Sequence, residues 1–389
     1  MTAYGDLAGV AAMAGHPRGG WLSGWRRLRD RLIARPAFQR WAASFPLTRP
    51  VAARRASALF DLCAGFVYSQ ILLACVRLRV FELLADGPLS SAVLASRAGL
   101  DAEMAERLLR AAAALDLVEA RGGGWGLGPL GAVLPGNEAL AAMIEHHALV
   151  YLDLADPVAL LRKEQTTRLA AYWGYAGAAD RDALDAGRVE GYTRLMATSQ
   201  SLVRDDVLDA LPMGRVRWLL DVGGGDGSFA IAAAQRWPDL RVTVFDLPAV
   251  VEIARQRIAE AGLAGRVAAV GGDFTRDALP QGADLISFVR VLHDHDEPVV
   301  RRVLEAARAA AMPGARIVVA EPMAAAPGAR RVGDAYFAFY LLAMGTGRAR
   351  SVAEITALLS DAGLVAVRER RTRRPLQTSL VEATVTQSV

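Results

Sequence analysis

From about residue 206 to the end of the chain, short apolar runs alternate with amphipathic stretches, and this alternation constrains the fold more than any other feature. The apolar runs include "VRWLLDVG", "RVTVFDL", "RVAAVGGDF", "DLISFVRVL" and "ARIVVAEPM". Apolar runs separated by helical patterns are typical of a parallel β-sheet with right-handed helical crossovers. The sequence therefore predicts an α/β, Rossmann-like, doubly wound domain over residues 206–389.

A glycine turn, "DVGGGDG", follows the first of these runs. A buried strand, a glycine turn and a helix from about Ser228 form the usual nucleotide-binding start of a doubly wound sheet. A dinucleotide fingerprint would carry a third glycine where Ser228 stands. Asp226, beside the helix N-terminus, would oppose a pyrophosphate there. The turn therefore favours an adenosine ligand without phosphate, such as S-adenosylmethionine.

The cationic amine and sulfonium of S-adenosylmethionine could approach the bare backbone of Gly223 and Gly225 closely. Asp246 ends the second run, where an acid accepts hydrogen bonds from both ribose hydroxyls. Asp273 and Phe274 end the third run, where they suit the adenine amino group and ring. Each aspartate could instead be an ordinary turn residue, but three acids after three successive strands favour the cofactor.

The N-terminal half reads as mostly helical. Ser90 or Ser91 can cap a short helix that Gly99 closes, Asp101 can cap a second helix, and "LVEARGGGWGLG" reads as a hairpin. This order predicts a winged helix over part of residues 56–205. Winged helices often read DNA, but "DAEMAERLLRAAAALDL" carries acids and alanines where a reader would carry Arg, Lys, Asn or Gln. We therefore expect a structural, dimerising domain and no nucleic-acid partner.

Residues 141–205 also look helical, with Pro157 near a helix start and a loop at "YWGYAG". The segment from Trp21 to Arg55 mixes Arg with Trp, Leu, Ile and Phe and contains one acid, Asp30. Such a mixture describes an interfacial amphipathic helix or an arm packed on a partner subunit. Pro36 and Pro46 should break it into short pieces. We treat residues 1–55 as an Arg-rich N-terminal arm with possible peripheral membrane contact.

Length and composition set wider limits. A chain of 389 residues, 53% of them hydrophobic, suits two globular domains. Cys63 and Cys75 are too few for a disulfide framework or a metal site, so we expect two buried thiols in a reducing cytoplasm. The N-terminus lacks the basic start of a secretory signal, and the apolar run "GFVYSQILLACV" stops at Arg77. The sequence thus predicts a cytoplasmic protein without a membrane span.

In combination, "DVGGGDG", "FDLP", "GGDF" and "VLHDHDEP" behind a winged-helix-like domain resemble the small-molecule O-methyltransferases of plants and bacteria, over roughly residues 60–389. The Arg-rich N-terminus and "YFAFYLLAMGTGRARS" are more closely similar to the carotenoid O-methyltransferases of purple phototrophic bacteria. The resemblance implies a homodimer that uses S-adenosylmethionine. It also implies that residues 206–389 are the methyltransferase domain.

The resemblance also implies roles for individual residues. His293 matches the general base that takes the proton from the acceptor hydroxyl, and Glu321 matches the acid that accepts the other ring hydrogen of this histidine. The implied cofactor-binding residues are Asp221, Gly223, Gly225, Asp246, Leu247, Asp273, Phe274 and Arg290.

The chain departs from the family pattern at three places. His295 stands where the family usually has Trp, and we expect it to pack or to contact substrate. Ala349 replaces the second glutamate of plant relatives, so the orientation of the base should depend mainly on Glu321. Val289 and Arg290 stand where a lysine often precedes the catalytic loop, and Arg290 is typical of bacterial members.

The stretch "DAYFAFYLLAMGTG", beginning near Asp334, could be plain core or could line the acceptor site, where Met344 and its aromatic neighbours would suit a long apolar chain. A hydroxylated carotenoid fits such a lining, and the expected reaction converts its tertiary 1-hydroxyl to the methyl ether. One alternative is carbon methylation of a bacteriochlorophyll precursor. A more distant one is an adenosylmethionine-binding winged-helix regulator, which the acidic helix disfavours.

Overall fold

The computed structural model describes residues 20–172, 203–211, 213–373 and 378–386. The chain divides into two compact units, residues 1–71 and residues 72–389. The first unit holds the N-terminal arm, and the second holds a small helical domain followed by the sheet.

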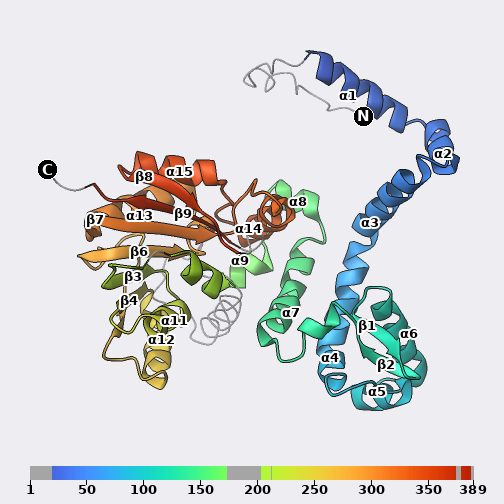
Figure 1. Cartoon of the computed structure of the whole chain (residues 1–389), viewed down its shortest axis with the longest axis horizontal. Coiled ribbons are helices and arrows are strands. Elements are labelled where there is room, and N and C mark those ends of the chain that lie inside the picture. Colours follow the sequence, from blue (N-terminus) through green and yellow to red (C-terminus); the bar gives the residue numbers. More distant parts are fainter. Residues whose placement is uncertain (1–19, 173–202, 212, 374–377, 387–389) are drawn as a thin grey trace. The chain divides into compact units, whose positions relative to one another are not determined.

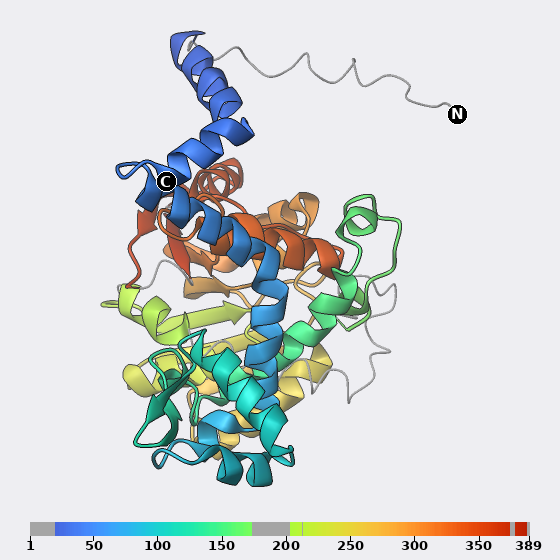
Figure 2. The same ribbon diagram turned by 90° about the vertical axis from the view of Figure 1, so that its right-hand side faces the viewer.

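The arm consists of α1 (Gly20–Ile33), α2 (Pro36–Ser44) and the greater part of α3 (Arg49–Arg77). Pro36 occupies the first turn of α2, where its missing N–H costs nothing, and the chain turns again between Phe45 and Thr48. The predicted interruptions near Pro36 and Pro46 are therefore confirmed, and Figure 2 shows the resulting bends. The predicted boundary between residues 55 and 56 falls inside α3.

One finding on α3 corrects an expectation. The most apolar 18-residue window of this helix has a mean hydropathy of 1.8, and 17% of that window is buried. By length and composition alone, α3 could therefore cross a membrane, because Arg77 ends the helix instead of interrupting its apolar part. Cys63, on the same helix, is exposed, contrary to prediction. Cys75 is buried as predicted, and burial raises the pKa of its thiol to about 12.

The small helical domain has the predicted winged-helix order. Its elements are α4 (Val80–Leu83), α5 (Ser91–Ala98), α6 (Ala102–Ala113), β1 (Val118–Arg121) and β2 (Gly124–Leu127). Ser90 accepts a hydrogen bond from the third residue of α5, Gly99 closes that helix with a φ of 67°, and Asp101 caps α6. Leu89 bridges Trp125 and extends the hairpin by one short pairing.

Further helices connect this domain to the sheet. They are a 3₁₀ turn (Gly131–Val133), α7 (Glu138–Asp153), α8 (Pro157–Leu161) and α9 (Arg168–Tyr172), followed by a helical stretch over 203–210. Pro157 is the first residue of α8, as expected. Beyond Tyr172, the predicted "YWGYAG" loop lies outside the described residues.

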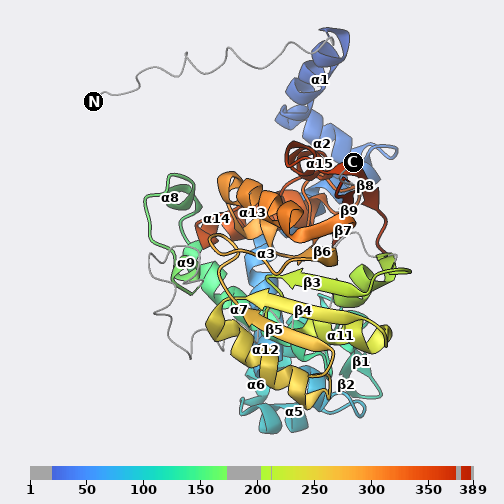
Figure 3. The same ribbon diagram turned by 90° about the vertical axis from the view of Figure 1, so that its left-hand side faces the viewer.

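The C-terminal part contains a seven-stranded sheet in the order β5-β4-β3-β6-β7-β9-β8. Strands β3 to β7 are parallel, and β9 runs antiparallel between β7 and β8. The bounds are β3 (Trp218–Val222), β4 (Arg241–Asp246), β5 (Val267–Gly271), β6 (Ala283–Val289), β7 (Ala311–Glu321), β8 (Val365–Arg370) and β9 (Ser379–Thr384). The order can be followed in Figure 3.

Helices cover both faces of the sheet (Figure 1). One face packs on α13 (Glu297–Ala310) and α15 (Val352–Asp361), and the other on α11 (Ser228–Arg236) and α12 (Pro248–Glu260). Neighbouring strand residues enter opposite cores: Leu219 packs with α11 and α12, and Leu220 with α13 and α15. This two-sided burial explains why the strands read as continuous apolar runs.

The order of the strands in the sheet determines where a ligand is expected to bind. β3 lies inside the sheet; from it the chain moves outward through β4 and β5 and then returns to β6 on the other side of β3. In open α/β sheets, ligands bind beyond the carboxyl ends of the strands at such a switch point. The glycine turn after β3 and the turn after β6 that contains His293 both lie there.

Candidate active site

The glycine turn requires glycine at defined positions. Gly223, Gly225 and Gly227 have φ values of 69°, 58° and 78°, a region that side chains rarely adopt. A Cβ on Gly223 would lie 2.7 Å from Cγ2 of Val291, whereas one on Gly225 would meet no atom within 4 Å. Gly225 thus leaves open space above the turn, as a closely approaching ligand needs.

Asp221 lies beneath this turn and is 1% exposed. Its Oδ1 accepts a hydrogen bond of 2.6 Å from Ser287 Oγ, and its Oδ2 has no partner in the described part of the chain. A Cβ on Gly224 would lie 2.6 Å from that Oδ2. Burial raises the pKa of Asp221 to about 7, with Ser287 lowering it and Asp246 raising it. An unpartnered buried carboxylate oxygen under bare backbone fits a cationic amine.

Asp226 corrects the charge argument made from sequence. Its carboxylate forms an ion pair with Arg257 from α12 and accepts hydrogen bonds from the backbone and side chain of Ser228. Only 4% of the Asp226 side chain is exposed. Because its charge is already compensated, Asp226 does not repel a phosphate as expected. The acids that remain without a cationic partner beside the turn are Asp221 and Asp246 among the described residues.

Asp246 ends β4 as predicted and faces the turn. Its Oδ2 accepts a hydrogen bond of 2.8 Å from the Gly225 amide, and its Oδ1 accepts one of 2.7 Å from the Leu247 amide. Burial raises the pKa of Asp246 to about 6, and these two amides lower it. The structure thus brings Asp246, Leu247 and Gly225 together, and Leu247 contributes through its backbone.

Asp273 and Phe274 follow β5. Oδ1 of Asp273 accepts hydrogen bonds from the backbone and the hydroxyl of Thr275, so this carboxylate also organises its own turn. The Phe274 ring meets His295 edge to face, with centroids 5.3 Å apart. Phe274 also lies 3.6 Å from where a Cβ on Gly223 would be. Phe274 therefore reaches the glycine turn, and His295 packs against it, which is one of its two expected roles.

His293 sits in a 3₁₀ turn (Leu292–Asp294) after β6 and is buried. Its backbone N–H donates to Glu321 Oε2 at 3.1 Å, while its ring Nε2 lies 3.1 Å from Asp294 Oδ1. The ring Nδ1 and Glu321 Oε1 have no hydrogen-bond partner among the residues that the structure describes. The expected pairing is therefore corrected: Glu321 holds the backbone of His293, and Asp294 holds its ring, because Asp294 belongs to the same tight turn.

The charges around His293 set its protonation. Burial alone would lower the pKa of the His293 ring, but Asp294 and Glu321 outweigh burial and raise that pKa above its ordinary value, while Arg290 opposes them. Burial raises the pKa of Glu321. Arg290 has a φ of 59°, and its amide donates to Ala320 on β7. This cation therefore lies near the base, and its predicted contact with the cofactor stays a prediction.

The stretch after β7 supplies aromatic neighbours of His293. It forms a π-helical turn (Arg331–Phe337) and α14 (Ala338–Met344). The Phe337 ring stacks on the His293 ring with centroids 5.6 Å apart. Met344 is 1% exposed and packs in a core with residues of α7, α8 and α9. Met344 is thus core, and Phe337 is the member of this stretch that faces the base.

Two histidines that the sequence analysis overlooked also reach this stretch. His147 Nε2 lies 2.7 Å from the Tyr336 hydroxyl, and His146 Nε2 lies 2.8 Å from the Tyr340 hydroxyl. Burial lowers the pKa of His146 to about 4 and raises that of Tyr336 to about 12, so both groups are neutral near pH 7. The two adjacent histidines in "EHHA" are the sequence feature that could have drawn attention to these contacts.

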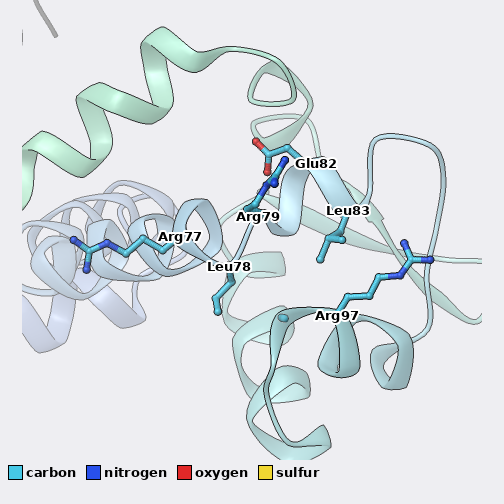
Figure 4. Close-up of a pocket in the computed structure, with 7 residues that line it drawn as sticks. Arg77, Leu78, Arg79, Glu82, Leu83 and Arg97 are labelled. Carbon is cyan, nitrogen blue, oxygen red and sulfur yellow. The ribbon is translucent and has the colours of Figure 1, made fainter. Parts of the chain in front are cut away.

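A separate pocket of about 470 Å³ lies in the small helical domain. Figure 4 shows Arg79 beside Glu82, with Arg77 and Arg97 extending to opposite sides. None of the predicted site residues lines it. In the part of the chain that the structure describes, no group of three or more His, Cys, Asp or Glu side chains could hold a metal ion.

Acids and bare glycines at the carboxyl ends of parallel strands, with a buried histidine beside them, define a doubly wound transferase that binds a nucleoside cofactor. Residues 151–365 match the O-methyltransferase domain family, and residues 60–135 match the O-methyltransferase dimerisation domain family. The chain belongs to the O-methyltransferase family.

Individual relatives support this assignment. The chain is 43% identical to demethylspheroidene O-methyltransferase of Cereibacter sphaeroides over 96% of its own length and 98% of the relative. It is 42% identical to demethylspheroidene O-methyltransferase of Rhodobacter capsulatus over 87% of its own length and 84% of the relative. Human N-acetylserotonin methyltransferase in complex with SAM superposes with a TM-score of 0.71, at 26% identity, over 86% of this chain and 98% of that one.

These matches make the protein an S-adenosylmethionine-dependent O-methyltransferase and confirm the predicted family, fold class and cofactor. The dimerisation domain indicates a homodimer. The roles of the individual site residues and the bounds of the three predicted domains stay predictions.

Proposed function

We propose that the protein methylates the tertiary 1-hydroxyl of an acyclic carotenoid of the demethylspheroidene type. The observation that carries this proposal is the 43% identity to demethylspheroidene O-methyltransferase, which extends over nearly the full length of both chains. The aromatic residues beside His293 are consistent with an apolar acceptor. The matches to O-methyltransferases do not favour carbon methylation of a bacteriochlorophyll precursor or an adenosylmethionine-binding regulator.

The site residues divide the chemistry between them. Bound S-adenosylmethionine supplies an electrophilic methyl group on a cationic sulfur. Asp246 would hold the ribose hydroxyls, the unpartnered Oδ2 of Asp221 would receive the amine, and Phe274 would cover the adenine. The glycine turn lets these groups approach, since Gly225 faces open space.

His293 would act as the general base. A hydrogen on Nε2 that is donated to Asp294 leaves the lone pair of Nδ1 free, and no described residue is a hydrogen-bond partner of Nδ1. Nδ1 would take the hydroxyl proton as the acceptor oxygen attacks the methyl group that the bound cofactor supplies, with the neutral thioether as the leaving group. Alignment of such reactants contributes about 7–11 kcal/mol, and a general base about 10²–10⁴-fold.

A methyl-transfer assay tests this function. Purified protein would be incubated with methyl-labelled S-adenosylmethionine and, separately, with detergent-solubilised 1-hydroxycarotenoid and bacteriochlorophyllide. Mass analysis should find one added methyl group on the carotenoid oxygen and none on the tetrapyrrole. Label in the tetrapyrrole alone would overturn the acceptor while leaving the family intact.

The N-terminal arm provides a second, independent proposal: contact with the cytoplasmic face of the inner membrane. Residues 21–55 carry many arginines and the single acid Asp30. Large apolar side chains of this segment are exposed, among them Trp25, Leu28, Trp41 and Phe45. The segment precedes the residues matched by the dimerisation domain, which begin at residue 60. Arginines beside exposed aromatic rings suit an anionic lipid surface.

Vesicle flotation tests membrane contact. The full chain should float with vesicles that contain phosphatidylglycerol and stay behind with pure phosphatidylcholine. The double variant Trp25→Ser, Trp41→Ser should lose flotation and keep its dimeric mass in light scattering. Flotation unchanged in this variant, or a loss of the dimer, would reject the membrane role, and the second result would assign the arm to the partner subunit.

A further inference from the structure

Arg350 is a fully buried arginine whose side chain grips the turn that carries His293. Its exposed fraction is 0%. Nη1 donates a hydrogen bond of 2.8 Å to the carbonyl of Leu292, and Nη2 donates one of 2.7 Å to the carbonyl of His295. These carbonyls lie on either side of His293 and Asp294. One rigid, planar group thus fixes both ends of the turn.

The backbone of Arg350 is itself fixed. Its carbonyl accepts a hydrogen bond of 2.9 Å from the Ala324 amide, in the segment that follows β7. The next residue, Ser351, forms a capping box with Glu354 at the start of α15. Arg350 therefore stands just before the N-cap of α15, and its backbone is hydrogen-bonded to the segment that follows β7. β7 is also the strand that ends in Glu321.

Neighbours of Arg350 contact the same turn. The Arg348 amide donates to the carbonyl of His293 at 2.9 Å, and Thr346 Oγ1 donates to the carbonyl of Asp294 at 2.9 Å. A Cβ on Gly347 would lie 2.1 Å from the His293 carbonyl oxygen, so only glycine permits this approach. Residues 346–350 therefore contact every residue of the turn from Leu292 to His295.

Stability alone does not account for a buried guanidinium at this position. Burying a charge costs several kcal/mol, and apolar residues of similar volume often stabilise a protein at least as well. The two hydrogen bonds of Arg350 go to neutral carbonyls, which repay less than a carboxylate would. Its charge does lower the pKa of Glu321, which holds the His293 amide.

We propose that Arg350 is a positioning residue that holds the 292–295 turn, and with it the His293 ring, in the geometry needed for proton removal. This inference rests on the proposed role of His293 as the base. It extends the site to a residue that touches neither reacting atom. It also gives a function to the "GRARS" segment, in which Ala349 replaces the glutamate of plant relatives.

Steady-state kinetics and cofactor binding test the proposal in the full-length enzyme. Arg350→Met should lower kcat by about 10²-fold, the loss typical of a misplaced reacting group, and should leave the Kd for S-adenosylmethionine nearly unchanged. Arg350→Lys should recover part of kcat because it keeps the charge and one donor. Thr346→Val, which removes one hydrogen bond to the turn, should lower kcat less than Arg350→Met.

Arg316→Met is the matched control. Arg316 is a largely buried arginine that pairs with Glu382 and does not touch the turn. Its replacement should leave kcat unchanged, because Arg368 and Arg370 still pair with Glu382. An equal loss of kcat in this control, or a weakening of cofactor binding that matches the loss of kcat in Arg350→Met, would overturn the positioning role.

The double variant His293→Ala, Arg350→Met separates the two proposals. If Arg350 acts through the base, the double variant should be no slower than His293→Ala alone, and additive losses would overturn that link. Full activity of His293→Ala would instead reject the base. If Arg350→Met does not fold, Arg350→Lys and Thr346→Val decide, and wild-type kcat in both would reject the proposal.

Discussion

Glu321 and His293 meet through the histidine backbone: the amide of His293 donates to Glu321 Oε2 at 3.1 Å, and the ring of His293 is held by Asp294. The two carboxylates therefore have different tasks, although both are close to one imidazole. Glu321 places the turn, and Asp294 orients the ring. This division allows the effect of each acid to be measured separately.

Replacement of His293 should affect chemistry alone. His293→Ala should lower kcat by about 10²–10⁴-fold, the usual contribution of a general base. The Kd for S-adenosylmethionine, measured by calorimetry, should change little, because Asp221, Asp246 and Asp273 belong to or follow other strands. A variant with weakened cofactor binding and normal kcat would show that this histidine binds the cofactor instead.

The acids around His293 should move the pH dependence of the reaction. The pKa of His293 lies above its ordinary value because of Asp294 and Glu321, and the base must be neutral, so kcat/KM should rise with pH through that raised pKa. Asp294→Asn removes a raising charge and should shift this rise to lower pH. Histidine-labelled NMR can follow the same change directly, since the chain has five histidines.

Glu321→Gln is the comparison for Asp294→Asn. The glutamine keeps an oxygen that accepts from the His293 amide. The charge that is lost raises the pKa of His293 less than the charge of Asp294 does. The rise of kcat/KM should therefore move less than in Asp294→Asn. The reverse order would mean that Glu321 orients the ring in the working enzyme.

The sequence predicted the parts of this protein that depend on local pattern. The strands, the caps at Ser90 and Asp101 and the glycine turn all follow from spacing and residue type. The structure confirms each of them. Positions of acids at strand ends were equally predictable, because parallel strands bring their carboxyl ends to one edge.

Contacts between distant segments were not predictable in this way. Nothing near Asp226 indicates that Arg257 on α12 will neutralise it, and nothing in "GRARS" indicates that Arg350 will grip the turn around His293. The exchange of roles between Glu321 and Asp294 depends on side-chain geometry within an angstrom. Resemblance to a family identifies which residue occupies a position, but it does not show which atoms that residue contacts.

Breaking the Asp226 and Arg257 pair should destabilise the sheet domain. Arg257→Met leaves a buried carboxylate with only Ser228 as partner, and such a change costs about 1–3 kcal/mol. The urea midpoint of unfolding should fall accordingly. The double variant Asp226→Asn, Arg257→Met should recover much of this stability, because it removes the unpaired charge. A midpoint that falls further in the double variant would contradict this account.

Replacement of Asp246 should weaken cofactor binding and leave the base untouched. Each hydrogen bond to a charged group contributes about 1.5–3 kcal/mol, so Asp246→Ala should raise the Kd for S-adenosylmethionine roughly 10–150-fold for each ribose hydrogen bond that it removes. At saturating cofactor, kcat should stay near the wild-type value. As a control, Asp239→Ala removes a largely exposed acid just before β4, at the amino end of the parallel strands. It should change neither the Kd for S-adenosylmethionine nor kcat.

Asp221 should make cofactor affinity depend on pH near neutrality. Its pKa is raised to about 7 in the free protein, and the ionised form is the one that suits a cationic amine. Binding below pH 7 must therefore release a proton, and the affinity should fall by up to about tenfold for each pH unit below that value. Above pH 7 the affinity should level off.

Asp221→Asn tests this dependence, because the amide oxygen still accepts from Ser287 while the charge is removed. The variant should bind S-adenosylmethionine more weakly at pH 8, and its affinity should vary by no more than about twofold between pH 6 and 8, since Asp246, with a pKa of about 6, is the acid that still titrates. Calorimetry in buffers of different ionisation enthalpy counts the released protons. Proton release at pH 7 that is undiminished in Asp221→Asn would assign the titration to another group.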